Sequence, residues 1–98
     1  MPCFFQENLA FGKHADQKNG AAYGGLASRG VDGNSETKYA KGSCTHTPSA
    51  VRPWWRVDLG QIEPVSEVYI VNRGDGGLGK RLNNFEIRVG RLAFLSIL

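Results

Sequence analysis

The sequence predicts an all-β fold, a β-sandwich, on three observations. Thirteen of the 98 residues are glycine, and many of these stand in pairs or beside Asn or Asp, which is typical of a chain built from short strands and loops. No stretch of useful length carries apolar residues at helical spacing. The second half of the chain contains runs that are typical of strands. At this length we expect one domain with a small core.

The clearest strand covers residues 54–59, where apolar and polar side chains alternate. Trp55, Val57 and Leu59 share one face of this run, and Gly60 ends it. Because Trp55 lies on the apolar face, we expect it to be a core residue and not a platform on which a sugar stacks.

Two further strands are predicted, over residues 65–72 and 84–89. The side chains of the later run that are expected to face inward are Phe85, Ile87 and Val89. Residues 73–81 lie between the two runs as a glycine-rich loop that carries charge. Binding groups often lie on loops between well-formed strands, so this loop is the first candidate for a functional site.

The first half and the two ends of the chain show no clear strand pattern. Residues up to about 48 are rich in Gly, Ser, Asn and Lys, and we predict loops around short strands there. Residues 1–7 form an N-terminal extension in which no signal peptide is visible. Residues 91–98 are almost continuously apolar but do not alternate, so we expect a divergent tail without a regular strand. Cys3 and Cys44 allow one disulfide or two free thiols.

Composition argues against several function classes. The net charge is +3, and the basic residues are scattered without a cluster, which disfavours nucleic-acid binding. No apolar run approaches the roughly 20 residues that cross a membrane as a helix. Neither a nucleophile with a base nor a catalytic pair of carboxylates is apparent, so we expect no enzyme.

Four stretches of the chain, taken in order, resemble one protein family. They are Asn8-Leu-Ala-Phe-Gly-Lys13, Ala27 through Asp32-Gly33-Asn34, Ser43-Cys-Thr-His-Thr47 with Pro53-Trp-Trp-Arg-Val-Asp-Leu-Gly60, and Asn72-Arg-Gly-Asp75 with Lys80-Arg-Leu-Asn-Asn-Phe-Glu-Ile-Arg-Val-Gly90. In these stretches the chain resembles the F-type lectin (fucolectin) family, within the discoidin-like galactose-binding superfamily. The first stretch is similar to the family's opening strand. The resemblance covers residues 8–90 and implies a jelly-roll β-sandwich in a secreted protein.

The family's domain is longer than the part that resembles it here, so the resemblance implies a sandwich that is incomplete at its C-terminus. The absent strands would also carry the partner of Cys44 in the family. Without them we expect an internal strand to become an exposed edge, which favours low stability and association between copies, and the apolar tail to cover the gap only partly.

The resemblance includes the family's signature for a sugar site, which falls on His46, then Arg73 and Asp75, then Lys80 after four residues. It implies recognition of L-fucose, with His46 contacting a ring hydroxyl. The chemistry suits a neutral sugar, because a guanidinium fork bonds two adjacent oxygens and a carboxylate two residues on can hold it in place. Lys80 adds rotatable donors. Tyr39 either supplies an aromatic contact or is an ordinary packed tyrosine.

Two positions depart from the family pattern. Gly76 and Gly77 stand where members often carry adjacent cysteines, whose disulfide offers the sugar a flat apolar platform. Glycine has the most backbone freedom to lose, so this loop is expected to be looser and fucose affinity lower.

A structural calcium ion is the implied cofactor. Asp32-Gly33-Asn34 is a good tight-turn sequence by itself, and its oxygens also suit a hard cation. The resemblance implies that Asp32 gives its side chain, that the carbonyls near Arg29 and Asn34 contribute, and that Ser43 supplies oxygens. The family's other ligands lie beyond the matching stretches, so the calcium site is expected to be incomplete.

Alternatives to a fucose-binding lectin stay open at this point. Arg73-Gly74-Asp75 is also the tripeptide that integrins read on exposed loops, so a cell-adhesion module is possible on sequence alone. A further alternative is a truncated lectin fragment that binds nothing, in which Arg73 and Asp75 form only a local ion pair. A lipid-binding discoidin domain is disfavoured, because the corresponding loops are glycine-rich and polar. The expected partners are fucosylated glycans and, as an oligomer, further copies of the chain.

Overall fold

The structure, a computed structural model of the 98-residue chain, describes residues 8–90 and 94–97. Strands and short 3-10 helices are the regular elements of this part, and it contains no α-helix. The strands are β1 (His14–Gln17), β2 (Trp55–Asp58), β3 (Ile87–Val89) and β4 (Phe94–Ile97). The 3-10 helices are η1 (Ala27–Val31), η2 (Tyr39–Lys41) and η3 (Leu78–Arg81).

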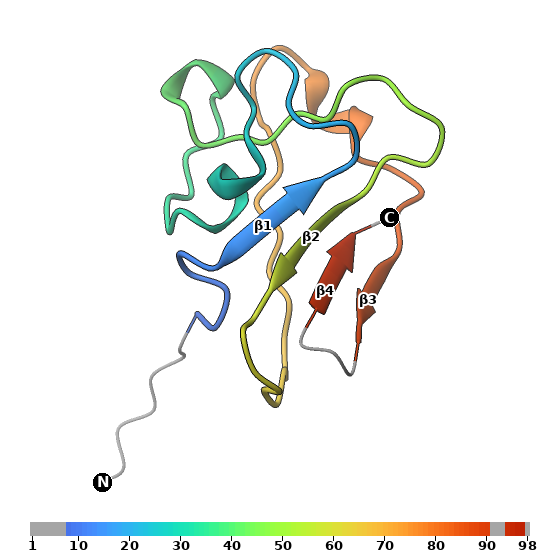
Figure 1. The fold of residues 1–98 in the computed structure, drawn as a ribbon. Coiled ribbons are helices and arrows are strands. Elements are labelled where there is room, and N and C mark those ends of the chain that lie inside the picture. Colours follow the sequence, from blue (N-terminus) through green and yellow to red (C-terminus); the bar gives the residue numbers. More distant parts are fainter. Residues whose placement is uncertain (1–7, 91–93, 98) are drawn as a thin grey trace, which may run out of the picture.

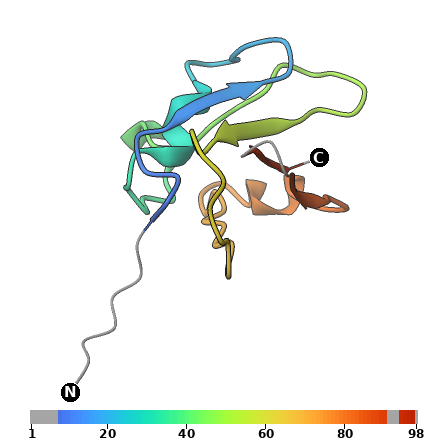
Figure 2. The ribbon, with the colours of Figure 1, turned by 60° about the horizontal axis from the view of Figure 1, so that its bottom comes forward.

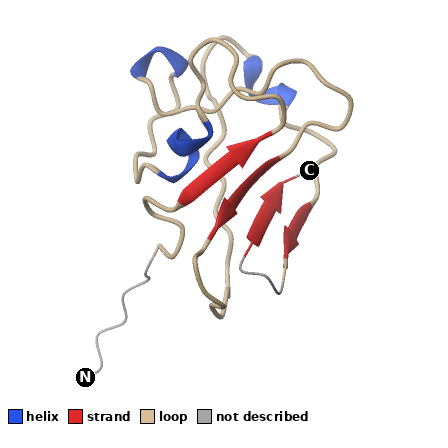
Figure 3. Ribbon diagram, viewed as in Figure 1, coloured by secondary structure: helices blue, strands red, loops and turns tan. Residues whose placement is uncertain are grey.

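The four strands form one antiparallel sheet in the order β1-β2-β4-β3 (Figure 1). Most of the loops, with η2 and η3, gather at the end of the sheet where β1 ends and β2 begins (Figure 3). Beneath one face of the sheet runs the extended segment 62–72, which forms a second layer (Figure 2). The predicted all-β class is confirmed, and the described sandwich is open because this second layer is one extended segment and not a paired sheet.

The predicted strand at residues 54–59 is confirmed as β2. Val57 is completely buried and Leu59 nearly so, and with Val31 they form the centre of the core. Trp55 packs against this centre as predicted, and its indole Nε1 donates a hydrogen bond of 2.9 Å to the Ala27 carbonyl oxygen. The apolar face of the alternating run therefore holds the sheet against η1.

The opening segment is a turn, which corrects the strand expected from its resemblance. The N–H of Phe11 bonds the carbonyl of Asn8 at 3.2 Å, and that of Lys13 bonds the carbonyl of Ala10 at 3.0 Å. Gly12 has a φ of +67°, which an L side chain rarely adopts and which interrupts an extended chain. The strand β1 therefore starts at His14.

The prediction of a strand at residues 65–72 is wrong. The segment is extended, but it pairs with no described strand. Its local pattern is β-prone, and Val65 and Val68 pack on the core, yet a strand also needs a neighbouring backbone with which to form hydrogen bonds.

The strand predicted at residues 84–89 is confirmed only over β3, and its predicted inward face is wrong. Phe85, Ile87 and Val89 are all exposed, because no described segment covers that face of β3.

The tail differs from the prediction because residues 94–97 form β4. This strand lies between β2 and β3, with Trp55 opposite Ile97 in one pair and Ile87 opposite the same residue in the other. A short apolar run without alternation is also the pattern of a central strand, which has a neighbour on each edge. β2 thus has a paired strand on each side, and among the described residues the free edges of the sheet are those of β1 and β3.

Two smaller points concern the chain as a whole. Cys44 is a free thiol among the described residues, and the possible pairing with Cys3 lies outside them. A search of the described residues for a membrane-crossing helix finds none of sufficient length and hydropathy.

Candidate functional site

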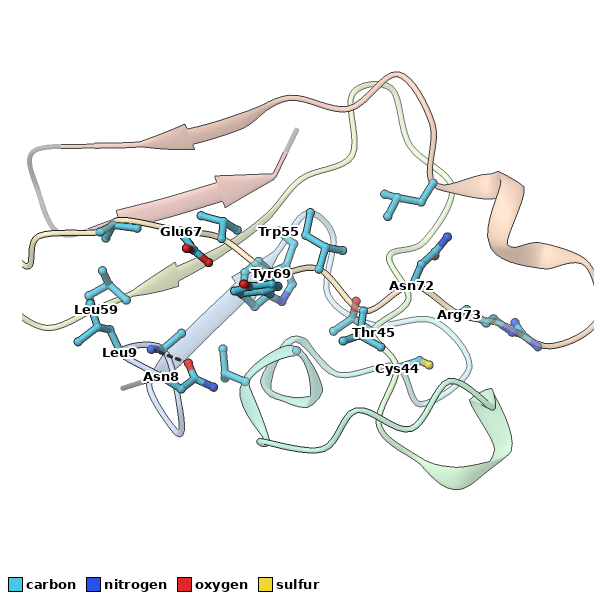
Figure 4. Close-up of a pocket in the computed structure, with 18 of the residues that line it drawn as sticks. Asn8, Leu9, Cys44, Thr45, Trp55, Leu59, Glu67, Tyr69, Asn72 and Arg73 are labelled. Atoms are coloured by element: carbon cyan, nitrogen blue, oxygen red, sulfur yellow. Dashed lines mark hydrogen bonds between the residues drawn. The ribbon is translucent and has the colours of Figure 1, made fainter. Parts of the chain in front are cut away.

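A cleft of about 960 Å³ lies between the sheet and the extended segment 62–72 (Figure 4). Its middle is lined by the core residue Trp55 and by Tyr69, and its far end by Asn8 and Leu9. The other end, which we call the polar end, is formed by Tyr39, His46 and Arg73. These three residues come from separate stretches of the sequence, and loops bring them together.

Arg73 is held in place by Asp75. Its Nε donates to Asp75 Oδ1 at 2.7 Å and its Nη2 to Oδ2 at 3.2 Å, so the guanidinium and the carboxylate meet in a two-pronged pair. A guanidinium has five N–H groups, and these two bonds leave three for another partner. The predicted role of Asp75, holding the fork from two residues away, matches this geometry.

The ion pair shifts the protonation of both groups. The hydrogen bond from Arg73 is the main cause that lowers the pKa of Asp75 from 3.8 to about 2, and the backbone N–H of Tyr39, 3.2 Å from Asp75 Oδ1, adds to it. In return the Asp75 carboxylate raises the pKa of Arg73. The site therefore keeps a fixed cation next to a fixed anion at any physiological pH.

Tyr39 lies between the two candidate sugar-contacting residues. The Arg73 guanidinium carbon lies 4.7 Å from the centre of the Tyr39 ring, which is the geometry of a cation–π contact. The His46 ring meets the same ring edge-on, with centroids 5.9 Å apart and planes at 86°. The Tyr39 hydroxyl is anchored by donating to the carbonyl of Tyr23 at 2.8 Å. The Tyr39 ring therefore contacts both Arg73 and His46, and its role as a sugar contact stays a prediction.

His46 is positioned through its backbone, not its ring. Its N–H donates to the Gly25 carbonyl at 2.9 Å, and its own carbonyl accepts from Ala22 at 2.8 Å. The buried Gln17 amide donates to both the Gly25 and the His46 carbonyls, at 2.8 and 3.2 Å. The imidazole nitrogens make no hydrogen bond within the described residues, so they remain available to a ligand.

Gly25 makes this arrangement possible. A Cβ at this buried position would lie 2.4 Å from the His46 backbone nitrogen and 2.7 Å from the Tyr39 hydroxyl oxygen. The backbone of residue 25 therefore approaches both site residues more closely than any side chain would permit.

The other cation of the signature, Lys80, is not among the residues that line the cleft, whereas its neighbour Arg81 is. Both lie on η3, which folds back so closely that a Cβ at Gly79 would be 2.9 Å from the Arg73 carbonyl oxygen. Lys80 is exposed, and its side chain bonds to no described residue. Sequence reasoning did not select Arg81.

The two glycines at positions 76 and 77 have different surroundings, because a Cβ at Gly76 would be in contact with the Leu78 side chain at 3.7 Å. Gly76 and Gly77 have φ values of +62° and +66°, and a Cβ at Gly77 would meet nothing within 4 Å. Gly77 precedes η3, so its left-handed backbone directs the chain into that helix. The two glycines thus shape the loop through their backbone conformation, and the apolar side chain beside them is that of Leu78, which lines the cleft.

Tyr23 is a second residue that sequence reasoning missed. Its ring is 84% exposed and lies 5.2 Å from the His46 ring, tilted by 32°. Its φ of +51° is unusual for a tyrosine and turns the side chain out of the Tyr23-Gly24-Gly25 loop. The only signal in the sequence is an aromatic residue beside two glycines.

The residues expected to hold calcium lie together in part. The Ser43 hydroxyl donates to Asp32 Oδ2 at 2.7 Å and to the Asn34 carbonyl at 3.1 Å, so three oxygens converge. The tight turn is confirmed, with the Asn34 N–H 2.9 Å from Asp32 Oδ1 and Gly33 at a φ of +75°. Arg29 lies on η1, three residues before Asp32.

This donor set fits calcium in kind, because it consists of oxygens alone. Asp32 is the one carboxylate in it, and no group of three or more His, Cys, Asp or Glu residues gathers anywhere in the described chain. A calcium ion takes six to eight oxygen ligands, so the described residues would hold it weakly.

Asp75→Asn is expected to change how stability depends on pH. Because the pKa of Asp75 is lower in the folded state, the Arg73 pair contributes its full stabilisation above pH 3.8 and loses it as the pH falls to about 2. The variant should unfold more easily at neutral pH and show a flatter decrease in stability over that acid range. Urea unfolding of both proteins as a function of pH measures this, and parallel profiles would contradict the role of the pair.

Comparison with known proteins gives consistent results. The model of the family described as NedA-like, galactose-binding domain matches residues 29–92. A fucolectin of the eel Anguilla anguilla is 39% identical over 92 residues, which is 90% of this chain and 58% of the fucolectin. The chain spans about half the length of the curated relatives it matches.

Solved structures of similar fold are also lectins. The lectin domain of lectinolysin, solved in complex with Lewis B antigen, superposes with a TM-score of 0.85 and 34% identity, over 93% of this chain and 84% of that domain. A fucolectin from the serum of striped bass, Morone saxatilis, superposes with a TM-score of 0.83 and 28% identity, over 93% of this chain and 41% of the bass protein.

Proposed function

Since the chain belongs to the NedA-like, galactose-binding domain family, we propose that it is a carbohydrate-binding lectin module that recognises L-fucose in glycans. The observation that carries this proposal is the polar end of the cleft. There the Tyr39 ring contacts both His46 and Arg73, and the Arg73 guanidinium is hydrogen-bonded to Asp75. The similarity to fucolectins and to a lectin domain bound to Lewis B antigen supports the choice of sugar. The named relatives are lectins, which favours a binding module over an enzyme.

The proposed recognition is hydrogen bonding without chemical change. The free N–H groups of Arg73 donate to two neighbouring sugar oxygens, because its fork is already fixed by Asp75 and by the Tyr39 ring. The His46 ring donates to a further hydroxyl. Fixing the donors before binding reduces the entropy lost on binding. A neutral sugar carries no charge that could pair with Arg73, so the affinity of one site is modest. Several sites that bind one glycan together give a higher overall affinity.

Retention on fucose-agarose tests the proposal. The chain should bind the resin and elute with free L-fucose, and an Arg-Gly-Asp peptide should not elute it. Passage of the folded chain through the resin would refute fucose recognition and would favour the non-binding fragment.

The cell-adhesion alternative is disfavoured by the geometry of the tripeptide. The Arg73 and Asp75 side chains are both partly buried and bind each other, and the Gly74 N–H donates to the Thr37 carbonyl at 2.9 Å. An adhesion receptor would need both side chains free on an exposed loop. Elution by an Arg-Gly-Asp peptide, and not by fucose, would reverse this assignment.

We further propose a weak calcium site at Asp32, Asn34 and Ser43, which would stabilise the loop after η1. The ion would neutralise Asp32 and take no part in sugar binding. We also propose an extracellular protein, which the serum origin of the similar bass fucolectin supports.

Calcium should therefore raise the temperature of unfolding. At a concentration ten times the dissociation constant, the stabilisation is about 1.4 kcal/mol, which shifts the midpoint of a domain of this size by several degrees. Millimolar calcium will be needed, as for many weak extracellular sites. Thermal unfolding by circular dichroism with calcium and with chelator measures the shift. Asp32→Asn should abolish the shift, and an equal shift in that variant would place the ion elsewhere.

A further inference from the structure

Gln17 is a polar residue at a core-facing position of β1. Ala15 packs against the core, and Gln17 lies two residues further along the strand, so both side chains leave the same face. Gln17 is opposite Trp55 in the pairing of β1 with β2, and it is only 8% exposed. An apolar side chain here would avoid the cost of burying an amide, so the packing of the sheet does not explain the glutamine.

The Gln17 amide is directed at three carbonyl oxygens. Its Nε2 donates to the carbonyls of Gly20 and Gly25, both at 2.8 Å, and of His46 at 3.2 Å. Its Oε1 is buried and accepts no hydrogen bond from the described residues. The opposite orientation of the amide would place Oε1 against all three carbonyl oxygens, so only the donor fits there. The three contacts are thus formed although one buried acceptor stays unpaired among the described residues.

The three carbonyls belong to two segments that build the polar end of the cleft. Gly20 and Gly25 lie in the loop that follows β1, and this loop also carries Tyr23, whose ring lies 5.2 Å from the His46 ring. The Tyr23 carbonyl in turn accepts the Tyr39 hydroxyl at 2.8 Å. One side chain of β1 therefore ties the loop to His46.

We propose that Gln17 is a positioning residue of the polar end, which fixes His46 and the Tyr23 ring through the backbones of their segments. β1 is paired with β2 along its whole length, so the sheet fixes the position of Gln17. The loop and His46 belong to no strand, and the amide links them to this fixed position. The role rests on the proposed function, because Gln17 acts on the sugar through His46 and does not itself line the cleft.

Gln17→Glu tests this role because it keeps the shape of the side chain and removes its amide. The acid donates no hydrogen bond when ionised and one when protonated, so it cannot hold all three carbonyls. The dissociation constant for L-fucose, measured by isothermal titration calorimetry, should rise about tenfold, which corresponds to one lost hydrogen bond of about 1.4 kcal/mol. In NMR spectra, the nuclear Overhauser contact between the Tyr23 and His46 rings should weaken. Gln61→Glu makes the same change at an exposed glutamine and should leave both measurements unchanged.

Gln17→Met is the second variant, and it removes the unpaired Oε1 together with the amide, so the fold should tolerate it better. It should show the same two losses. A residue that served the fold alone would lower the unfolding temperature and leave the fucose affinity and the ring contact as they are. Native affinity with a native ring contact in either folded variant would overturn the role.

The native chain offers a measurement that needs no substitution. The side-chain amide protons of Gln17 should exchange slowly with solvent, because they are buried and donate to carbonyls. Fast exchange would overturn the role of Gln17 even if neither variant folded. A native chain that does not bind L-fucose would refute the lectin function, and the ring contact in the variants would still decide whether Gln17 positions His46.

Discussion

Arg73→Ala is expected to abolish measurable fucose binding. The substitution removes the preformed fork and with it two charge-assisted hydrogen bonds to the sugar, each of which contributes about 1.5–3 kcal/mol. It also leaves Asp75 without its main partner and removes the cation that stacks on Tyr39. Because the starting affinity of a neutral-sugar site is modest, the loss places binding outside the range of isothermal titration calorimetry.

Two companion variants separate the causes of that loss. Arg73→Lys keeps the charge but lacks the planar fork, so it should also bind poorly. Lys80→Ala should have a smaller effect than Arg81→Ala, since Arg81 lines the cleft and Lys80 does not. Unchanged affinity in Arg73→Ala, with the fold intact by circular dichroism, would remove the site from consideration.

Gly25→Ala is the second change with a large expected effect, although residue 25 touches no sugar. The added methyl group would lie 2.4 Å from the His46 nitrogen and 2.7 Å from the Tyr39 hydroxyl oxygen, so both residues must move. Overpacking of this kind costs about 1–3 kcal/mol of stability. The movement also breaks the Gly25–His46 backbone bond, so fucose affinity should fall at least about tenfold, or about 1.4 kcal/mol.

Gly60→Ala is the matched control for that variant. A Cβ at Gly60 meets nothing within 4 Å, but its φ of +82° strains any other residue. The control should therefore lose about 1–2 kcal/mol of stability and keep its fucose affinity. Equal affinity in both variants would show that Gly25 serves the fold and not the site.

Local patterns predicted the elements that local forces determine. The alternation that ends at Gly60 predicted β2. Side chains alternate between the two faces of a strand, so a run with an apolar residue at every second position buries all of them on one face. Asp32-Gly33-Asn34 predicted its turn, because the Asp side chain can accept from the backbone two residues on.

The elements that depend on distant neighbours were not predictable in this way. Residues 65–72 have the composition of a strand but no described partner, while residues 94–97 lack alternation and became β4 between two neighbours. Pairing is a property of two segments, and one sequence shows them only one at a time.

The residues of the candidate site also fall into those that local sequence predicts and those that it does not. Arg73 and Asp75 were predictable as a pair, because two residues of an extended chain share a side. His46 came only from the family spacing, since nothing local indicates that its backbone bonds Gly25. Tyr23 depends on a left-handed backbone that tyrosine rarely adopts, so the two glycines that follow it were too weak a signal to select it.

The most direct test of the lectin assignment is a nitrogen-resolved NMR titration of the chain with L-fucose. Recognition at the polar end predicts that the Arg73 Nε–H and the His46 ring shift together, with a single dissociation constant, and that the indole of the core residue Trp55 stays in place. Saturating L-fucose that leaves the Arg73 and His46 signals unmoved would contradict a fucose site in this cleft.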